Sequence, residues 1–149
     1  MRWRHCLTLL VFTLFITALP GGAGAQNRTL LVIKTVLASQ GPSYLDPKLT
    51  HQVQEFQSLF RYSAYRLLHV TKLVLPIRQS TSTRLPGNRF LKISADGISG
   101  NRIALGIDMF RRKQLVFHTA IRLMNHGSIT LGGALHEGGV LLLNISASF

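Results

Sequence analysis

The amino-acid sequence predicts a mainly β domain of the α+β class, with about seven antiparallel strands in a sandwich or half-barrel and one amphipathic helix near the N-terminus. Three observations support this prediction. Apolar and polar residues alternate along residues 102–123, turn-forming residues separate short apolar runs at regular intervals, and only residues 47–61 repeat apolar side chains at helical spacing. A period of two residues places alternate side chains on opposite faces of a strand, as in a sheet with one buried face.

The first 25 residues are typical of a Sec-type signal peptide. A short basic region with Arg2 and Arg4 precedes an apolar run at residues 7–19, and an A-x-A sequence follows at 23–25. The run is shorter than the roughly 20 apolar residues that a membrane-spanning helix needs. We therefore expect cleavage after Ala25 and a single mainly β domain at residues 26–149, periplasmic or secreted and not transmembrane after cleavage. An uncleaved anchor is the alternative.

The composition excludes some kinds of site and favours anionic partners. The only cysteine, Cys6, lies inside the expected signal peptide, so the mature domain can have no disulfide, cysteine nucleophile or thiolate metal site. The chain has 17 Lys and Arg against 5 Asp and Glu, a net charge of +12, of which Arg2 and Arg4 contribute two. We expect the partner to be an envelope protein complex, or an anionic polymer or lipid surface of the envelope. A basic surface that only keeps an exported protein soluble is the alternative.

The first part of the domain is expected to contain a buried strand and the helix. Residues 29–38 are rich in Leu, Val and Ile and predict a strand that is buried on both faces for much of its length. A helix is predicted at about 47–61, because Asp46 can cap it and Pro47 suits the first helical position. Its apolar stripe predicts packing on a sheet, and its mixed polar face argues against a membrane-surface helix. The stripe consists of Leu49, Val53, Phe56, Leu59 and Phe60.

The middle of the chain predicts two strands separated by a polar segment. A long strand at 65–75 ends at Pro76, and a short strand follows at 90–94. The segment 78–84 between them is polar and weakly basic, and we expect it to be a mobile loop. Residues 96–101 form a second cluster of turn-forming residues.

The last third of the chain predicts two hairpins. Strands at 103–109 and 115–123 alternate most clearly, and residues 111–114 form the charged turn between them. Strands at 128–131 and 140–147 form the closing hairpin, joined by a wide glycine-rich connection at 132–139. Because apolar side chains occupy both faces of 140–147, we expect that strand to be a central one around which the earlier strands pair.

The first of these hairpins carries the candidate anion-binding residues. Its outer face and its tip are basic, so we expect a continuous cationic strip suited to phosphate or carboxylate groups. Nucleic acid is not the expected partner, because Phe56, Phe60 and Phe117 fall at inward positions and leave no aromatic platform for bases. The strip consists of Arg102, Arg111, Arg112, Lys113 and Arg122.

His136 and Glu137, in the glycine-rich connection, form the second candidate site. The glycines of a phosphate-binding loop must open a helix, whereas a strand follows here, so a turn explains these glycines more simply. Adjacent residues on extended backbone point to opposite sides, which is poor geometry for a shared metal or an acid–base pair. The chain also has no recognisable zinc-binding pattern. We therefore predict no metal and no cofactor.

No catalytic residue is predicted. Most of the five carboxylates have a structural assignment, with Asp46 as a helix cap, Asp96 as a turn residue and Glu55 on the surface of the helix. The strained G-x-S-x-G turn of a serine hydrolase is absent. We expect the protein not to be an enzyme, although residues far apart in sequence can converge in a fold.

Several short segments resemble an uncharacterised group of small secreted proteins found as hypothetical open reading frames in Gram-negative bacteria. The similarity spans nearly the whole mature chain, and its motifs are turns, a cap and core strands. The resemblance implies a periplasmic location and brings no activity, ligand or site residue with it. The segments are 36–39, 46–47, 60–68, 85–87, 131–133 and 138–142.

Together these observations predict an exported, non-enzymatic binding or assembly module of the bacterial envelope, which docks on anionic surfaces or adds partner strands to its sheet edges. One alternative is a periplasmic carrier or sensor that holds an anionic lipid-like ligand in a cavity between helix and sheet. The other is an enzyme whose polar residues converge in the fold.

Overall fold

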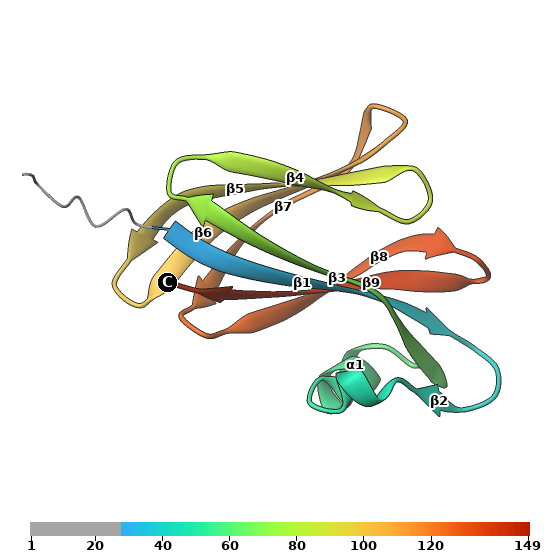
Figure 1. Cartoon of the computed structure of the whole chain (residues 1–149). Coiled ribbons are helices and arrows are strands. Elements are labelled where there is room, and N and C mark those ends of the chain that lie inside the picture. Colours follow the sequence, from blue (N-terminus) through green and yellow to red (C-terminus); the bar gives the residue numbers. More distant parts are fainter. Residues whose placement is uncertain (1–27) are drawn as a thin grey trace, which may run out of the picture.

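The computed structural model describes residues 28–149, which form two β-sheets and one α-helix (Figure 1). The expected signal peptide at 1–25 lies outside the described residues. Sheet A has the strand order β2-β3-β1-β9-β8, and sheet B has the order β4-β5-β6-β7. Sheet A contains β1 (Arg28–Ser39), β2 (Tyr44–Leu45), β3 (Ala64–Pro76), β8 (Ser128–His136) and β9 (Gly139–Ser148); sheet B contains β4 (Ser80–Leu85), β5 (Arg89–Ser99), β6 (Arg102–Arg111) and β7 (Gln114–Met124).

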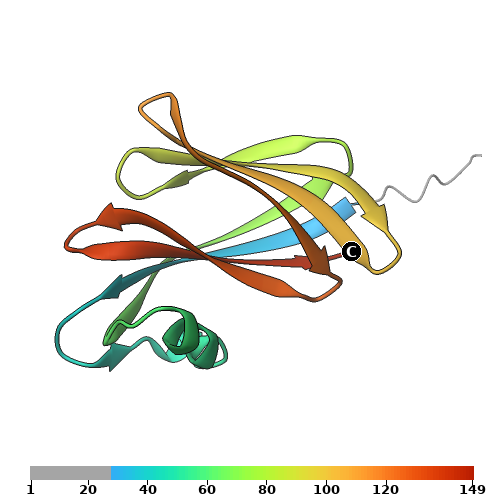
Figure 2. The ribbon, with the colours of Figure 1, turned by 180° about the vertical axis from the view of Figure 1, so that it is seen from behind.

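The mainly β class is confirmed, with nine strands in the described part of the chain where about seven were predicted. Every neighbouring pair is antiparallel except β2 and β3. The chain leaves sheet A after β3, forms all of sheet B as a meander, and returns to sheet A through the β7–β8 connection (Figure 2). The turns β4–β5, β6–β7 and β8–β9 all lie at one end of the molecule, on the right in Figure 1.

The main core lies between the two sheets. Alternate residues of β1 and β9 point to sheet B, and alternate residues of β5 and β6 point back. Many of these side chains are fully buried, and full burial of an aliphatic side chain stabilises the fold by about 1.5–3 kcal/mol. Members of this core include Leu31, Ile33, Leu91, Ile93, Leu105, Ile107, Leu143 and Ile145.

Strand β9 is a central strand, as predicted, because it lies between β1 and β8. Leu141, Leu143 and Ile145 are buried on the face towards sheet B. Leu142 is buried on the opposite face, in a second cluster beneath the helix. The continuous apolar run at 140–143 therefore reflects a strand that is covered on both sides.

The helical segment is shorter than predicted. In place of one helix at 47–61, a 3₁₀ turn η1 (Pro47–Leu49) precedes α1 (Val53–Leu59). Asp46 caps η1 by accepting a hydrogen bond from the Lys48 N–H, and Phe60 already has extended backbone. The Tyr65 hydroxyl donates to the Phe60 carbonyl at 2.6 Å, which fixes the chain where the helix ends.

Two expected loops are strands. Residues 80–85 form β4 instead of a mobile loop, paired with β5 so that Ser82 lies opposite Lys92. Thr residues alternate with Ser there, and β-branched Thr favours strand backbone. Residues 96–99, expected to be a turn, continue β5 past a bulge at Asp96.

The closing hairpin has a tight turn instead of a wide connection. β8 continues to His136, and only Glu137 and Gly138 form the turn, with φ of +46° and +74°. The other glycines allow close approach of neighbouring groups. A Cβ on Gly132 would lie 2.8 Å from the ring of Phe60, and one on Gly133 would lie 2.6 Å from the carbonyl oxygen of Leu141.

Candidate functional site

The five basic residues predicted to form one strip lie at the two ends of sheet B. Arg102 begins β6 and Arg122 lies near the end of β7, whereas residues 111–113 lie at the opposite end. A ten-residue strand such as β6 spans about 30 Å. Between the two groups the same face carries Asp108, whose Oδ1 lies 2.5 Å from His118 Nδ1. The predicted continuous strip is therefore two separate groups.

The β6–β7 turn holds two basic residues in a backbone conformation that favours Asn or Gly. Arg112 has a φ of +48° and Lys113 a φ of +69°. Two-residue turns of this kind prefer Asn-Gly, because a side chain with a Cβ is disfavoured at positive φ. Two exposed cations are thus held at the tip of the hairpin at some cost in stability.

A row of four side chains crosses the whole of sheet B beside this turn. Arg84 pairs with Phe90, Phe90 with Phe110, and Phe110 with Leu115, so all four lie on the outer face. The guanidinium carbon of Arg84 lies 5.8 Å from the centre of the Phe90 ring, a cation–π distance. Phe90 is 43% exposed and Leu115 is 54% exposed. We call this row, together with residues 111–113, the tip surface.

Two further apolar side chains lie next to Leu115 on β7. Val116, which occupies a bulge in β7, is 52% exposed, and Phe117 is 36% exposed. Leu135 on β8 is 80% exposed, but it pairs with Val140 and lies on the helix side of sheet A, away from the tip surface. Val116 and Phe117 also line a hollow of about 180 Å³ between β7 and β8. Phe117 lies opposite buried Met109, so the prediction that it falls on the inner face is confirmed, although it is 36% exposed on the edge strand. Phe90, however, supplies an exposed aromatic ring on the outer face, so the aromatic argument against nucleic acid no longer holds.

Arg89 joins the two sheets at the same end. Its side chain is only 4% exposed, and its guanidinium donates to the carbonyls of Pro86 at 2.9 Å and Leu135 at 2.8 Å. Its Nε has no partner among the described residues. Burial lowers the pKa of Arg89, and the nearby charge of Arg111 lowers the pKa further. The alternation of Arg89 with Leu91 and Ile93 could have indicated that it points inward.

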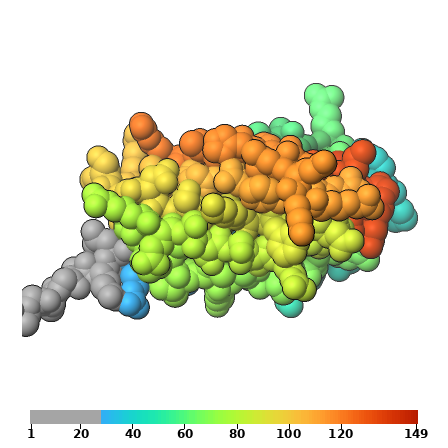
Figure 3. Space-filling view, turned by 90° about the horizontal axis from the view of Figure 1, so that it is seen from above, coloured from blue at the N-terminus to red at the C-terminus, as the bar shows by residue number. Residues whose placement is uncertain are grey.

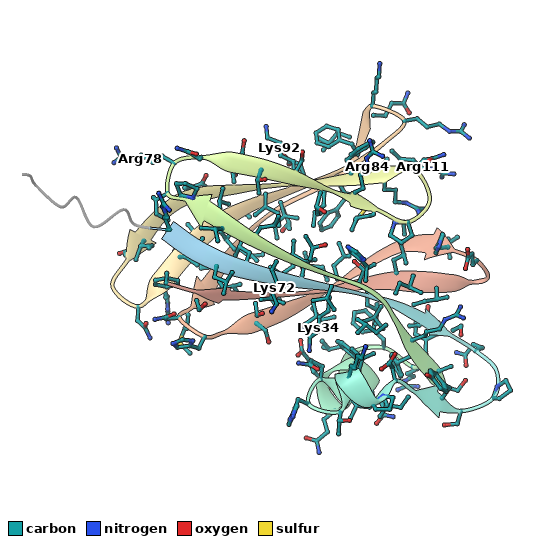
Figure 4. The ribbon with its side chains drawn as sticks, viewed as in Figure 1. Lys34, Lys72, Arg78, Arg84, Lys92 and Arg111 are labelled. Atoms are coloured by element: carbon teal, nitrogen blue, oxygen red, sulfur yellow. The ribbon has the colours of Figure 1, made fainter. Side chains whose placement is uncertain are left out.

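Other cations extend along the outer face of sheet B. Figure 4 shows Arg78, Lys92, Arg84 and Arg111 on the side of the molecule that faces away from sheet A, and Lys34 and Lys72 on sheet A. Figure 3 looks onto this outer face, from β4 in green to β7 in orange. Lys92 lies opposite Asp108 in the pairing of β5 with β6, so the centre of the face is electrically mixed. The tip end is the more strongly cationic part.

His136 and Glu137 do approach each other, contrary to the expectation that they point apart. Their side chains come within 3.6 Å, because Glu137 lies in the turn with positive φ and not on extended backbone. This distance is too long for a strong hydrogen bond. Within residues 28–149 no group of three or more His, Cys, Asp or Glu side chains gathers as metal ligands would.

The space between helix and sheet, where a ligand cavity was considered, is occupied by side chains. Phe56 and Tyr65 stack there with ring centres 5.7 Å apart, and both are buried. Leu49, Val36, Ala38 and Leu142 complete this cluster. None of the helices in the described part of the chain has the length and apolar character needed to cross a membrane.

No family model, curated protein or solved structure matches the chain. The chemistry of the side chains themselves is therefore the basis for a functional interpretation.

Proposed function

We propose that the protein is a non-enzymatic binding module of a bacterial envelope that docks on anionic membrane surfaces through the tip surface. One observation carries this proposal: exposed apolar side chains and at least four cations are mixed at one end of the sandwich. Arg84, Phe90 and Leu115 lie in one row beside the basic turn. The exported location expected from the N-terminal sequence would place this end next to anionic lipids.

The mixture of apolar and basic side chains fits a lipid surface better than a purely polar polyanion. Each Lys or Arg near an anionic membrane contributes about 1 kcal/mol to binding. Aliphatic side chains such as Leu115 and Val116 offer no flat face on which nucleic-acid bases could stack, but they can enter the boundary between headgroups and acyl chains. Charge attraction and apolar insertion are each weak alone, but together they give stable yet reversible attachment to a membrane.

Partner-strand addition is less favoured at this end of sheet B. An added strand needs a regular row of unpaired backbone groups along the edge. The bulge at Val116 interrupts that row on β7, and bulges protect edge strands from pairing. Surface docking uses side chains and is not affected by the bulge.

The turn allows a variant that weakens binding while it strengthens the fold. Arg112→Asn with Lys113→Gly removes two charges and introduces the preferred residues for the turn, so we expect a rise of about 1 kcal/mol in the free energy of unfolding. Loss of about 2 kcal/mol of attraction should weaken binding to vesicles of phosphatidylcholine with phosphatidylglycerol by about 30-fold. Co-sedimentation with vesicles and urea unfolding measure the two effects.

A matched control removes two charges elsewhere. Arg66 and Lys72 are exposed on sheet A, and Arg66→Gln with Lys72→Gln should bind vesicles within a few-fold of the native chain. Equal weakening by both double variants would mean that only net charge matters, which contradicts the tip surface. Strong binding to a single-stranded oligonucleotide without vesicle binding would contradict the membrane as partner.

A further inference from the structure

A second binding feature lies on sheet B at the end opposite the tip surface. A hollow of about 340 Å³ opens there. Its lining comes from β5, β6 and β7, and the proposal for the tip surface does not use it. The lining residues are Gly97, Ser99, Arg102, Ile103, Ala104 and Arg122.

A bulge in β5 produces the open floor of this hollow. The pairing of β5 with β6 shifts between Ala95 and Gly97, so Gly97 lies opposite Ala104. Ala104 in turn lies opposite Arg122 on β7. A Cβ placed on Gly97 would meet no atom within 4 Å. Gly97 and Ala104, two of the smallest residues, thus leave room between strands that carry long basic side chains.

The two arginines are diagonal neighbours around this floor. Arg102 pairs with Met124, two residues along β7 from Arg122, a geometry that brings long side chains within reach of each other. Neither guanidinium forms a salt bridge with any described residue. The acids that precede and follow Arg102 along the chain, Asp96 and Asp108, line the adjacent hollow with Lys92 instead. Like charges at such neighbouring positions repel each other, and an anion between them would remove this repulsion.

We propose that this hollow is a binding site for a phosphate dianion, either inorganic phosphate or a phosphate monoester. Guanidinium groups present planar pairs of N–H donors that match the oxygens of phosphate, and two of them can hold one tetrahedral group from two sides. The hydroxyl of Ser99, which has no other hydrogen bond among the described residues, supplies a further donor. Two guanidinium groups and one hydroxyl are matched best by a ligand with two negative charges and three free oxygens. A phosphate diester has only one charge and two free oxygens, so it fits less well.

Titration of the full chain with inorganic phosphate, followed by amide NMR shifts, tests the site. Gly97→Leu fills the floor and keeps both arginines in the chain, Arg122→Gln removes one donor pair, and Lys72→Gln removes one charge on the other sheet. We expect saturable shifts around Gly97 and Ala104 in the native chain and in Lys72→Gln. Affinity should fall at least tenfold in the other two variants.

Several results would overturn the proposal. It fails if Arg122→Gln binds phosphate as the native chain does, and that variant decides the matter should Gly97→Leu not fold. It also fails if the shifts do not saturate and are shared by all exposed basic residues, because that pattern indicates general screening of charge.

Vesicles distinguish the sources of the phosphate group and keep this site separate from the tip surface. Gly97→Leu is added to the Arg112→Asn/Lys113→Gly variant for this test. If a lipid headgroup is the ligand, the added substitution should further weaken binding to vesicles of phosphatidic acid, which is a monoester. It should not weaken binding to phosphatidylglycerol vesicles of equal charge. Unchanged vesicle binding with lost phosphate binding would identify a soluble phosphate compound. Either result supports the hollow, whatever the outcome for the tip surface.

Discussion

At the scale of single residues, the tip surface contains side chains that the fold alone would not select. Arg112 and Lys113 occupy positions with positive φ, where Asn and Gly fit better. Arg89 is buried without a carboxylate partner among the described residues, although burial of an unpaired charge is unfavourable. Strain and unfavourable burial that persist together at one place are a common sign of a functional surface.

Tyr65 gives a prediction about pH. Burial raises the pKa of the Tyr65 phenol above its ordinary value of 10.0. The unfolded chain therefore loses this proton first, and the free energy of unfolding should fall as pH rises through about 10. Tyr65→Phe removes the hydrogen bond to Phe60, which should cost about 1 kcal/mol at neutral pH.

The difference between native chain and Tyr65→Phe isolates this residue from the other groups that titrate at alkaline pH. Urea unfolding of both proteins at several pH values from neutral to about 11 should show that the gap between them narrows above pH 10. A gap that stays constant over the whole range would show that Tyr65 ionises equally in both states, contrary to the buried geometry.

At the scale of elements, bulges in the strands determine where side chains meet. The bulge at Val116 shifts β7 so that His118 lies opposite Asp108, and the bulge at Asp96 places Gly97 opposite Ala104. A third bulge, between Gly132 and Leu135, lets β8 turn tightly into β9. Each bulge changes the pairing by one residue, which moves every later side chain relative to the neighbouring strand.

Gly139 offers a test of the packing of the central strands. A Cβ at this position would overlap the carbonyl oxygen of Ala38 on β1, and Gly139 is buried. Gly139→Ala must push β9 away from β1, so we expect a loss of about 2 kcal/mol or more in the free energy of unfolding. Chemical denaturation measures this loss in the free energy of unfolding.

Gly97→Ala is the matched control, because a Cβ there meets nothing within 4 Å. Alanine replaces glycine in a strand with a gain of up to about 1 kcal/mol, so the two substitutions should have opposite signs. Similar effects of both would contradict the close contact between Gly139 and Ala38.

At the scale of the whole molecule, the sequence predicted the layers better than the details that create the sites. Alternation along β6 and β7 and the apolar run of β9 were sufficient to place the core. Strand β4 was missed because a polar edge strand of Ser and Thr resembles a loop. The row from Arg84 to Leu115 depends on the register of three strand pairs, which periodicity cannot supply.

The helix and the cationic strip failed for related reasons. Periodicity suggested a helix to 61, but tertiary contacts of Tyr65 end it at Leu59. Charge on one hairpin suggested one strip, but the length of β6 separates the basic residues into two groups. Both errors come from interactions between segments that are distant in sequence.

The most direct test of docking through the tip surface is the fluorescence of a tryptophan placed in it. In a chain with Trp3→Phe, which removes the only natural tryptophan, Leu115→Trp should shift its emission to shorter wavelength when phosphatidylglycerol vesicles are added, because the indole leaves water. Val74→Trp, on the exposed outer face of sheet A, should not shift. Docking through the tip surface would be contradicted if the Leu115→Trp protein bound vesicles without a change in its emission wavelength. It would also be contradicted if the emission of Leu115→Trp and Val74→Trp shifted equally.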